Sequence, residues 1–328
     1  MISLDRKILE DNSQVAARMK RYGEREDMVI LIPEGSGESR VLSDRVHAVG
    51  TGGRKLQQFF RLVRMGCTLG REHRVTHVTC QDPFLTGLAG SLIARRLRAS
   101  LEIQSHGDFF DSAYYRQSSL KNYLYYHLGK FVLRRADSIR VVSERARRGT
   151  VSIGVSPEKI HVKPILVDLE KLRTTKPAFD LRKQYPGAAR IFLSIARLVR
   201  VKNLPWLIET FHEHLKAYPD DILLMVGDGP ERSHIERLVR ALELEQRALI
   251  LGFKDDTVSY MKGADALLIS SLSEGYSLSA IEARALELPI IMTDVGVAGF
   301  ELLPSKTVKV VPIGDRTAFL TAMRQVSK

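Results

Sequence analysis

The chain has 328 residues, of which 44% are hydrophobic and 27% charged, and this balance excludes a mainly disordered or fibrous protein. Its length is typical of two domains, and no apolar run approaches the roughly 18 residues that a membrane span requires. With only Cys67 and Cys80 there is no disulfide framework and no four-cysteine zinc site, so we expect a cytoplasmic protein. Residues 1–7 lead into a charged segment, which predicts no signal peptide.

The net charge of +12 is distributed unevenly along the chain. Residues 1–166 contain 28 Lys and Arg against 17 Asp and Glu, whereas residues 167–328 contain 22 against 21. A strongly basic half predicts an acidic partner on that side of the protein. Nucleic acid, an anionic membrane surface and an acidic or phosphorylated substrate are all compatible with the charge alone.

Short apolar runs of strand type alternate with helical segments in the first half of the chain. Apolar residues at i, i+3 and i+4 spacing predict helices at 54–65 and 85–97. The chain then loosens over 155–187, a stretch that contains several prolines. The strands expected before this stretch lie at 28–33, 46–49, 76–80, 100–105 and 138–142.

The alternation restarts after this break, with near-continuous apolar strands expected at 191–196, 222–227, 248–251, 266–270 and 290–292. Strands that are apolar on both faces, with helices between them, predict parallel sheets covered on both sides. We therefore expect an α/β fold with two doubly wound, Rossmann-like domains facing across a cleft. The expected boundaries are an N-terminal domain at 1–165, a linker at 166–189 and a C-terminal domain at 190–328. In such sheets ligands bind at the carboxyl ends of the strands.

Several familiar motifs are absent from the sequence. Gly50 and Gly52 follow an expected strand, but Lys55 stands where the G-x-G-x-x-G pattern requires its third glycine. There is also no G-x-x-x-x-G-K-[ST] phosphate loop, no H-E-x-x-H and no Asp-x-Asp. These absences disfavour dinucleotide oxidoreduction, P-loop hydrolysis and zinc proteolysis.

The segment SEGYSLSAIEARALELPII at 273–291 is the most informative one. It follows an expected strand and turns into a helix near Ser277, with Ser273 or Ser277 as candidate N-cap. Glu274 lies in the loop and Glu282 lies in the helix. Backbone amides at the helix N-terminus form a favourable site for a diphosphate. The alternative is an ordinary strand, loop and helix with a solvated glutamate at each end.

Three further loops follow strands of the second half. SIARLVRVKN at 194–203 brings Arg197 and Lys202, whose guanidinium and ammonium groups together suit a pyrophosphate. VGDGP at 226–230 contains glycines that allow close approach of the backbone to a ligand, and LGF at 251–253 follows the next strand. Each loop alone is a weak signal, because basic loops are usually just solvated. Four such loops at successive strand ends predict one shared site.

This order of loops resembles a known family. ARLVRVKN, VGDGP, LGF and an E-x7-E pattern ending in EARALELPII closely resemble the retaining GT-B glycosyltransferases of sequence-based family 4, the glycosyl transferases group 1. In the first half, THVTCQDPFLTGLAGSLIARRL, LEIQSHGDFF and ADSIRVVSE are similar to the family's strand, helix and cleft-histidine segments. The resemblance covers most of residues 76–313.

The resemblance implies a nucleotide-sugar donor held mainly by the C-terminal domain. Glu282 then binds the two ribose hydroxyls, and Arg197 and Lys202 bind the diphosphate and stabilise the charge that develops as the glycosidic bond breaks. Glu274 hydrogen-bonds to sugar hydroxyls. The remaining donor-binding residues expected from the family are Gly275, Tyr276, Ser277, Leu278 and Gly229, with Phe253 and Lys254 beside the base.

On the other domain, the family assigns His106 to contact with the transferred sugar once the cleft closes, and Asp108 either to the site or to capping the next segment. The reaction implied is transfer with retention by front-face attack, in which the departing phosphate helps to take the acceptor proton. Neither a metal nor another cofactor is expected. We therefore expect a hexosyltransferase-type enzyme that transfers a sugar to a glycan or lipid-linked acceptor in polysaccharide or glycolipid biosynthesis.

Two alternatives remain open on the sequence alone. The first is a catalytically weak protein that binds a nucleotide sugar without transferring it. The second is a basic nucleic-acid-binding protein, although no nucleic-acid motif is present and no nucleic-acid partner is expected.

The sequence also departs from the family pattern. The usual Gly-rich loop after the first strand is missing, and Gly52 and Gly53 appear only after a later strand. Glu287 stands where a small residue or glycine is common. Family members usually continue through further C-terminal helices, whereas this chain stops at Lys328. We therefore expect either a C-terminal domain truncated at these helices or a less restrained domain closure.

The stretch YYRQSSLKNYLYYHLGKFVLRR at 114–135 mixes tyrosines with basic residues. The favoured interpretation is one amphipathic helix with its leucines and one phenylalanine facing the core. The alternative is a surface that binds anionic lipid at the inner face of the membrane and collects a lipid-linked acceptor. The expected core-facing residues are Leu120, Leu124, Leu128 and Phe131.

Overall fold

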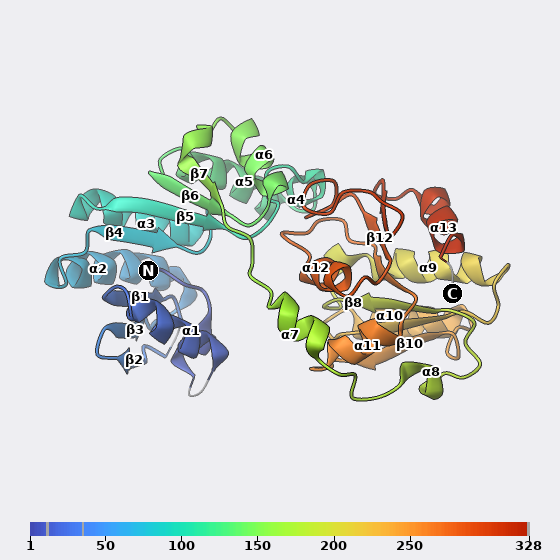
Figure 1. Ribbon diagram of the computed structural model, residues 1–328. Helices are drawn as coiled ribbons and strands as arrows, with labels where there is room; N and C mark the ends of the chain where they lie inside the picture. The colour runs from blue at the N-terminus through green and yellow to red at the C-terminus, as the bar shows by residue number, and fades with distance from the viewer. Residues whose placement is uncertain (11–12, 35, 327–328) are drawn as a thin grey trace. The chain divides into compact units, whose positions relative to one another are not determined.

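The computed structural model describes residues 1–10, 13–34 and 36–326. The chain divides into two compact units, each with an α/β architecture around largely parallel strands (Figure 1). The fold class expected from the sequence is therefore confirmed. Unit 1 comprises Met1–Val142 and Ala146–Lys163, and unit 2 comprises Ser143–Arg145 and Pro164–Lys328.

Unit 1 contains two ladders of strands, in the orders β1-β3-β2 and β4-β5-β6-β7. All pairs are parallel except β2 with β3. The sequence did not predict β2, a largely exposed edge strand, or β7, a short strand within the stretch expected to be loose. The strands are β1 (Met28–Ile32), β2 (Ser39–Ser43), β3 (Val46–Gly50), β4 (His77–Cys80), β5 (Ser100–Ser105), β6 (Ser138–Val141) and β7 (Ile160–Val162).

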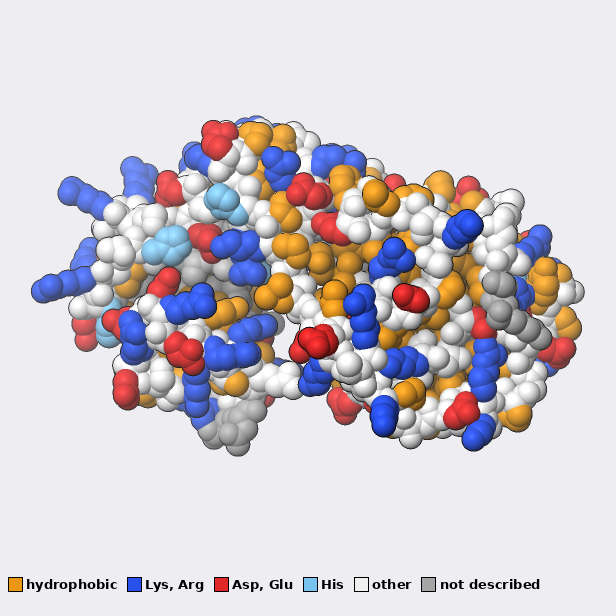
Figure 2. All heavy atoms as spheres, in the orientation of Figure 1, with side chains coloured by type: hydrophobic (Ala, Val, Ile, Leu, Met, Phe, Trp, Pro, Cys, Tyr) orange, Lys and Arg blue, Asp and Glu red, His pale blue; other side chains and the backbone are white. Residues whose placement is uncertain are grey.

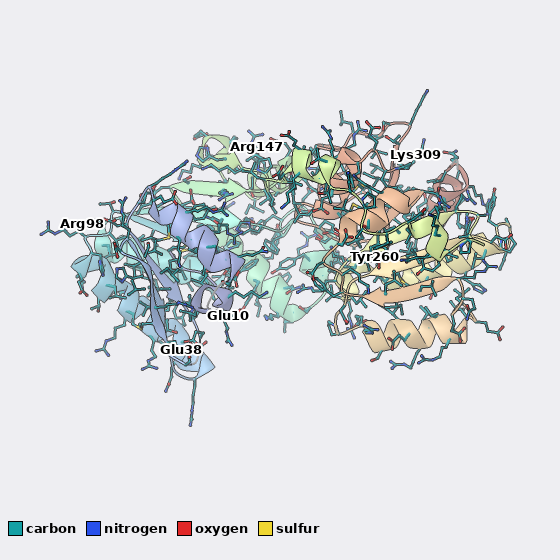
Figure 3. The ribbon with its side chains drawn as sticks, turned by 60° about the horizontal axis from the view of Figure 1, so that its bottom comes forward. Glu10, Glu38, Arg98, Arg147, Tyr260 and Lys309 are labelled. Carbon is teal, nitrogen blue, oxygen red and sulfur yellow. The ribbon has the colours of Figure 1, made fainter. Side chains whose placement is uncertain are left out.

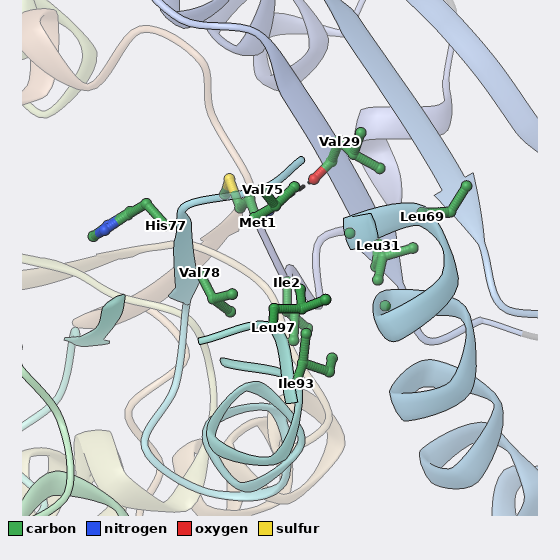
Figure 4. Close-up of a pocket in the computed structure, with 12 residues that line it drawn as sticks. Met1, Ile2, Val29, Leu31, Leu69, Val75, His77, Val78, Ile93 and Leu97 are labelled. Atoms are coloured by element: carbon green, nitrogen blue, oxygen red, sulfur yellow. Dashed lines mark hydrogen bonds between the residues drawn. The ribbon is translucent and has the colours of Figure 1, made fainter. Parts of the chain in front are cut away.

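The N-terminal residues join the two ladders. The amide of Ile2 donates to the carbonyl of Thr79 at 2.8 Å, and the amide of Leu31 donates to the carbonyl of Met1 at 2.9 Å. Residues 1–3 therefore run between β1 and β4. Beside them lies a cavity of about 30 Å³ that is lined mainly by aliphatic side chains (Figure 4). Because this lining offers few polar partners, the cavity is a packing gap in the core of unit 1.

Helices cover the sheet of unit 1, and α2 packs against α3, which packs against α5. These three helices form one layer, which is called the α2–α3–α5 layer below. Among the residues that the structure describes, no helix is both long and apolar enough to cross a bilayer. The helices are η1 (Arg6–Leu9), α1 (Gln14–Gly23), α2 (Lys55–Glu72), α3 (Leu85–Leu97), α4 (Ala113–Gln117), α5 (Leu120–Leu133), α6 (Glu144–Ser152) and η2 (Pro157–Lys159).

The prediction of one helix over 114–135 is wrong, because Ser119 interrupts it. Ser119 has an extended backbone, with φ −167° and ψ 157°, and its hydroxyl accepts a hydrogen bond from the amide of Asn122 at 3.1 Å. This is N-cap geometry, so α4 ends before Ser119 and α5 begins after it.

The predicted orientation of this helix is also wrong for three of its four residues. Leu120, Leu124 and Phe131 are 76%, 58% and 46% exposed, and only Leu128 packs against the core. The buried side of α5 carries Val132 and Leu133 instead. Because both sides of this sequence are apolar at helical spacing, periodicity alone does not select the inward face.

Unit 2 is built on one parallel sheet of six strands in the order β10-β9-β8-β11-β12-β13. Its strands are mostly buried, as their near-continuous apolar sequences predict. Only β13, which contains Lys309, was not predicted. The strands are β8 (Ile191–Ile195), β9 (Ile222–Val226), β10 (Ala248–Gly252), β11 (Ala266–Ile269), β12 (Ile290–Thr293) and β13 (Val308–Val311).

The segment 166–189, which the sequence assigned to a linker, contributes two helices to unit 2. Helix α7 packs against α12, where Arg173 donates to the carbonyl of Ala285 at 3.0 Å, and α8 packs against α11. The helices of unit 2 are α7 (Leu169–Thr174), α8 (Leu181–Gln184), η3 (Arg200–Lys202), α9 (Leu204–Leu215), α10 (Arg232–Ala241), α11 (Thr257–Gly263), α12 (Leu278–Ala285) and α13 (Arg316–Arg324).

A buried charge network closes the amino ends of β8 and β9. Arg190 donates from Nε and Nη2 to Oδ2 of Asp221 at 2.9 and 2.6 Å, and Nε2 of His214 lies 2.7 Å from the same oxygen. Burial alone raises the pKa of Asp221, but hydrogen bonds from His214 and Arg190 outweigh it and lower that pKa below its usual value. Arg190 also donates to the carbonyls of Met323 and Val326 and so anchors the end of α13.

Replacing Asp221 with Asn is expected to lower the free energy of unfolding of unit 2 by about 3–5 kcal/mol, since it leaves the Arg190 charge buried without its counter-charge. The neighbouring substitution Asp220→Asn is the matched control. Asp220 is 66% exposed and pairs with Arg247, so its loss should lower that free energy by less than about 1 kcal/mol. Urea unfolding followed by circular dichroism measures both. Equal losses for the two variants would contradict the buried network.

Candidate functional site

The order of strands in unit 2 reverses at β8. From β8 the chain moves to β9 and β10 on one side, and it then returns to β11, β12 and β13 on the other side (Figure 1). The loops that follow β8 and β11 therefore leave neighbouring strands and turn toward opposite faces of the sheet. In open parallel sheets the crevice at such a reversal is where ligands bind.

Main-chain and side-chain hydrogen bonds hold these two loops together. The amide of Leu272 donates to the carbonyl of Val201 at 2.8 Å, and the hydroxyl of Ser270 donates to the carbonyl of Lys202 at 2.8 Å. Both bonds join the loop after β11 to η3. The side chains carried by the two loops are thus fixed relative to each other within unit 2.

Lys202 and Glu274, which the sequence assigned to the same ligand, form an ion pair with each other. Nζ of Lys202 lies 2.5 Å from Oε1 of Glu274, which also accepts a hydrogen bond from the hydroxyl of Ser271 at 2.6 Å. The side chains of Lys202 and Glu274 are 22% and 11% exposed. A lysine ammonium has three protons to donate, so this pair leaves Lys202 able to bind an anion as well.

Arg197 follows β8 directly and is exposed. Within residues 1–10, 13–34 and 36–326 it makes no ion pair, whereas its neighbour Arg200 lies 3.6 Å from Glu231. Arg197 is therefore a cation without a counter-charge at the point where the strand order reverses.

The glycines of VGDGP have a structural role that the sequence reasoning did not foresee. A Cβ on Gly227 would lie 1.9 Å from the carbonyl oxygen of Ala196, and one on Gly229 would lie 2.4 Å from that of Leu198. The loop after β9 thus packs directly on the loop after β8. The close approach that these glycines allow is to the protein's own backbone, and donor binding at Gly229 stays a prediction.

The loop that leads into α12 has an unusual conformation. Ser277, at the N-cap position, has φ +60° and ψ 69°, and its buried hydroxyl has no hydrogen-bond partner among the described residues. A left-handed serine is strained, and such strain gathers at functional sites. Burial, followed by the charge of Glu301, raises the pKa of the neighbouring Tyr276. Leu278, the first residue of α12, is 41% exposed.

Two residues that the sequence did not select for the site support, within unit 2, this loop and the loop after β12. The hydroxyl of Ser143 donates to the carbonyl of Gly275 at 3.2 Å. The buried guanidinium of Arg145 donates to the carbonyls of Gly296 and Ala298 and pairs with Asp294, and so fixes the loop after β12. The role of Arg145 could not be predicted, because several arginines lie close together in this part of the sequence and no local pattern distinguishes Arg145 from its more exposed neighbours.

Glu282 lies one turn after Leu278 on the same side of α12. Its side chain is half-buried, and burial alone raises its pKa above the usual glutamate value. Nowhere in the described part of the chain does its carboxylate find a hydrogen-bonding or charged partner. A desolvated carboxylate without such a partner is a candidate for ligand binding.

Phe253 and Lys254 follow β10, the edge strand of the sheet, and both are exposed. The ring of Phe253 is 70% exposed, which is unusual for a large apolar side chain. The structure thus places an uncovered aromatic face at the carboxyl end of the sheet, two strands away from β8.

His106 belongs to unit 1 and follows β5. Desolvation, reinforced by the positive charges of Arg140 and Arg18, lowers the pKa of its imidazole below the usual value. The lowered pKa favours the neutral imidazole. Asp108 is buried and accepts a hydrogen bond from the amide of Asp111 at 3.2 Å, within the turn before α4, whose N-cap is Ser112. Contact of His106 with the transferred sugar stays a prediction.

In the described part of the chain, no group of three or more His, Cys, Asp or Glu side chains lies close enough together to hold a metal ion. Metal independence of the reaction stays an expectation.

Replacing Glu282 with Gln is expected to leave the free energy of unfolding unchanged or to raise it slightly at pH 7, because burial disfavours the ionised carboxylate in the folded state. Ionisation of Glu282 destabilises the folded state as pH rises through the raised pKa. The difference in free energy of unfolding between variant and wild type should therefore vanish below the usual glutamate pKa of about 4.3. The control Glu274→Gln removes the ion pair with Lys202 and should destabilise the chain. Denaturant titrations at several pH values measure the free energy of unfolding of both variants. A large decrease for Glu282→Gln would show that the carboxylate of Glu282 has a partner.

His106 is expected to titrate below about 6.5, the usual histidine pKa. Replacing Arg140 with Gln should raise this pKa, because it removes one of the two nearby positive charges. The measurement is a pH titration of the imidazole resonances by NMR. A pKa of His106 at or above the usual value would contradict the environment described.

Residues 189–328 match the family described as glycosyl transferases group 1, and residues 13–165 match the glycosyl transferase 4-like domain. The chain is 27% identical over 218 residues to the UDP-Gal:alpha-D-GlcNAc-diphosphoundecaprenol alpha-1,3-galactosyltransferase of Escherichia coli, an alignment that covers 64% of this chain and 56% of the relative. It is 28% identical over 205 residues to the N-acetyl-alpha-D-glucosaminyl L-malate synthase of Bacillus anthracis, covering 62% of this chain and 53% of the relative.

Among solved structures, the HepE protein of Anabaena in complex with UDP and glucose superposes with a TM-score of 0.74 at 16% identity. The superposition covers 98% of this chain and 88% of that one. At 16% identity this similarity shows the fold alone. The chain spans little more than half the length of the two curated relatives. Since the two family matches together account for nearly the whole chain, it belongs to the group 1 glycosyl transferases and has their GT-B fold.

Proposed function

We propose that this chain is a glycosyltransferase that transfers a sugar, with retention of configuration and without a metal ion, from a nucleotide-sugar donor to a glycan or lipid-linked acceptor. The observation that carries the proposal is the set of uncompensated charges at the strand-order reversal of unit 2. Arg197 has no counter-charge among the described residues, and Glu282 is desolvated without a partner. An anionic diphosphate and a ribose diol are the groups that satisfy these two side chains.

The cations supply the catalytic interaction in this proposal. As the glycosidic bond breaks, the bond's electron pair passes to the phosphate oxygen, and the negative charge on the leaving diphosphate increases. Arg197 and Lys202 stabilise this charge more strongly in the transition state than in the ground state, so they increase kcat. The ion pair with Glu274 holds Lys202 in position before the donor binds.

The anionic and polar residues orient the donor. Glu282 accepts hydrogen bonds from the ribose hydroxyls, which offsets its desolvation. Glu274 binds hydroxyls of the sugar through the oxygen that is not committed to Lys202 and Ser271. The amides of Gly275, Tyr276, Ser277 and Leu278 contact the sugar and phosphate at the start of α12.

The base lies near Phe253 and Lys254, where the exposed ring offers a stacking surface. His106 contacts the transferred sugar as a neutral imidazole, which can donate one hydrogen bond and accept another. Attack of the acceptor on the face that the diphosphate leaves accounts for retention, with the phosphate oxygen taking the acceptor proton. The E. coli relative is named as a galactosyltransferase that acts on a sugar linked to diphosphoundecaprenol, and this supports a lipid-linked acceptor.

Isothermal titration calorimetry with UDP-, GDP- and ADP-sugars is expected to find one donor class that binds the wild-type chain. Replacing Glu282 with Ala should weaken its binding at least tenfold, because the ribose hydroxyls lose their acceptor. Replacing Arg197 with Ala should weaken donor binding and lower kcat by about 100-fold, as the loss of one charge-stabilising donor typically does. Arg200→Ala is the matched control, since Arg200 is adjacent but paired with Glu231, and it should change neither value more than about twofold.

Transfer assays with radiolabelled donor separate the proposal from its alternatives. Donor binding with no turnover on any glycan or lipid acceptor would favour a protein that only binds nucleotide sugars. A salt-sensitive complex with nucleic acid and no donor binding would favour a nucleic-acid-binding protein. Equal effects of Arg197→Ala and Arg200→Ala would contradict the assigned diphosphate site.

A further inference from the structure

One face of the β4–β7 ladder in unit 1 is polar. On the other face, Val78, Ile103 and Ile139 are buried in one core with residues of the α2–α3–α5 layer. Side chains alternate between the two faces along a strand, so the residues next to these point the opposite way. Strands of parallel sheets are usually apolar on both faces, and this departure needs an explanation. The residues of the polar face, as it is called below, are Thr79, Glu102, Gln104, Arg140 and His161.

Arg140 lies within the polar face without a partner. In the register of the ladder its neighbours are Gln104 on β5 and His161 on β7. Its side chain is partly buried, and its Nε atom is buried without a hydrogen-bond partner among the residues that the structure describes. Withdrawing a charged donor from water without supplying an acceptor is unfavourable. Arg140 therefore has interaction energy left for a ligand.

The carboxylate of the polar face does not compensate Arg140. Oε1 of Glu102 accepts hydrogen bonds from the hydroxyl of Thr79 and from Nε2 of Gln104, both at 3.1 Å. Nε2 of Gln104 also donates to the hydroxyl oxygen of Thr79 at 3.2 Å. These bonds hold Glu102 and Gln104 toward β4. The positive charge of Arg140 thus forms no ion pair within the described part of the chain.

A second arginine approaches the carboxyl end of the polar face. Arg18 is an exposed residue of α1, which packs against β2 and β3, and it forms no ion pair with any described residue. Arg18 and Arg140 both lie near enough to His106 for their positive charges to lower its pKa. Figure 2 shows Lys and Arg side chains gathered over α1 and near β5. Residues from α1, from β6 and from the loop after β5 therefore lie near one another, in a place whose positive charge is not compensated.

A phosphate group suits this place better than other polar groups do. A guanidinium can donate two parallel hydrogen bonds to a phosphate, which carries up to about two negative charges at neutral pH. Two arginines balance that charge, whereas a single carboxylate would leave one of them uncompensated. An uncharged sugar would leave both uncompensated. The imidazole of His106 can donate a further hydrogen bond.

We propose that Arg140 and Arg18 bind a phosphate group of the acceptor on the polar face of unit 1. The identification of the phosphate-bearing molecule as the acceptor rests on the proposed function. The proposal deepens that function by giving the acceptor a chemical class, namely a sugar phosphate or a sugar linked to a lipid through a diphosphate. Arg140 is then a residue that determines acceptor specificity, while the donor diphosphate is bound in unit 2.

The first test uses inorganic phosphate as the probe and the imidazole of His106 as the reporter, in the full chain. A phosphate bound by Arg18 and Arg140 places negative charge near His106. The pKa of His106, measured by NMR titration, should therefore be higher by about 0.5 or more in phosphate than in a chloride buffer of equal ionic strength. Arg140→Gln should abolish this difference between the two buffers.

Two variants serve as controls for the phosphate test. Arg98, just after α3, extends away from unit 1 (Figure 3), so Arg98→Gln should respond to phosphate like wild type. Arg197→Ala should also keep the response, which separates this site from the donor site of unit 2. Circular dichroism establishes that each variant is folded. If Arg140→Gln does not fold, Arg18→Gln decides the outcome, because Arg18 is exposed on a helix.

Transfer assays then separate a phosphate of the acceptor from free phosphate. Two acceptors are compared, one with its sugar linked to a lipid through a diphosphate and the other with the same sugar in an uncharged lipid glycoside. Arg140→Gln should raise the KM for the diphosphate acceptor about tenfold or more, through loss of a charge-assisted contact, and change kcat and the donor Kd no more than about twofold. The KM for the uncharged acceptor should not change.

The two tests have separate outcomes. An equal His106 pKa in phosphate and chloride, or a difference that persists in Arg140→Gln, would overturn the phosphate site. A phosphate response with equal KM effects of Arg140→Gln on the two acceptors would assign the site to free phosphate and overturn its link to the acceptor. A phosphate response without transfer to any acceptor would contradict the proposed function and leave Arg140 and Arg18 as an anion site of another kind.

Discussion

The reversal of strand order between β8 and β11 is the constraint on which the rest of unit 2 depends. It sends the loops after these two neighbouring strands to opposite faces of the sheet, and hydrogen bonds from Leu272 and Ser270 to η3 then fix the two loops together. Arg197, Lys202 and Glu274 reach the same edge of the sheet for this reason alone. Glu274 lies far in sequence from Arg197 and Lys202, so bringing the three side chains together depends on topology.

Charged side chains are compensated at one end of this sheet and uncompensated at the other. At the amino ends, Arg190 and Asp221 are buried and compensate each other completely, with His214 completing the network. At the carboxyl ends, Arg197 has no counter-charge among the described residues and Glu282 is desolvated without a partner. The first arrangement stabilises the fold, whereas the second leaves interaction energy for a ligand. This contrast within one sheet distinguishes a structural ion pair from a binding site more clearly than residue type does.

Sequence alone predicted the strands that are buried on both faces, because their apolar runs leave no other interpretation. It failed for β2 and β13, which are more exposed, and for α5, where apolar residues occupy both sides and only packing selects Val132 and Leu133. The site residues could be located by their place after strands. Their pairing could not, since the Lys202–Glu274 ion pair joins separate loops. The departure at Glu287 has a local explanation: its φ of +59° is the left-handed conformation after a helix, where glycine is favoured.

The central claim is that the loops after β8 and β11 bind one nucleotide-sugar donor. Hydrogen–deuterium exchange of the full chain, with and without a saturating donor, tests it most directly. The account predicts that, within unit 2, the donor slows exchange most strongly in two separated segments, 197–203 and 274–282, and leaves the amino ends of β8 and β9 unchanged. Protection of only one of these segments, or protection centred elsewhere in unit 2, would contradict a site built at the strand-order reversal.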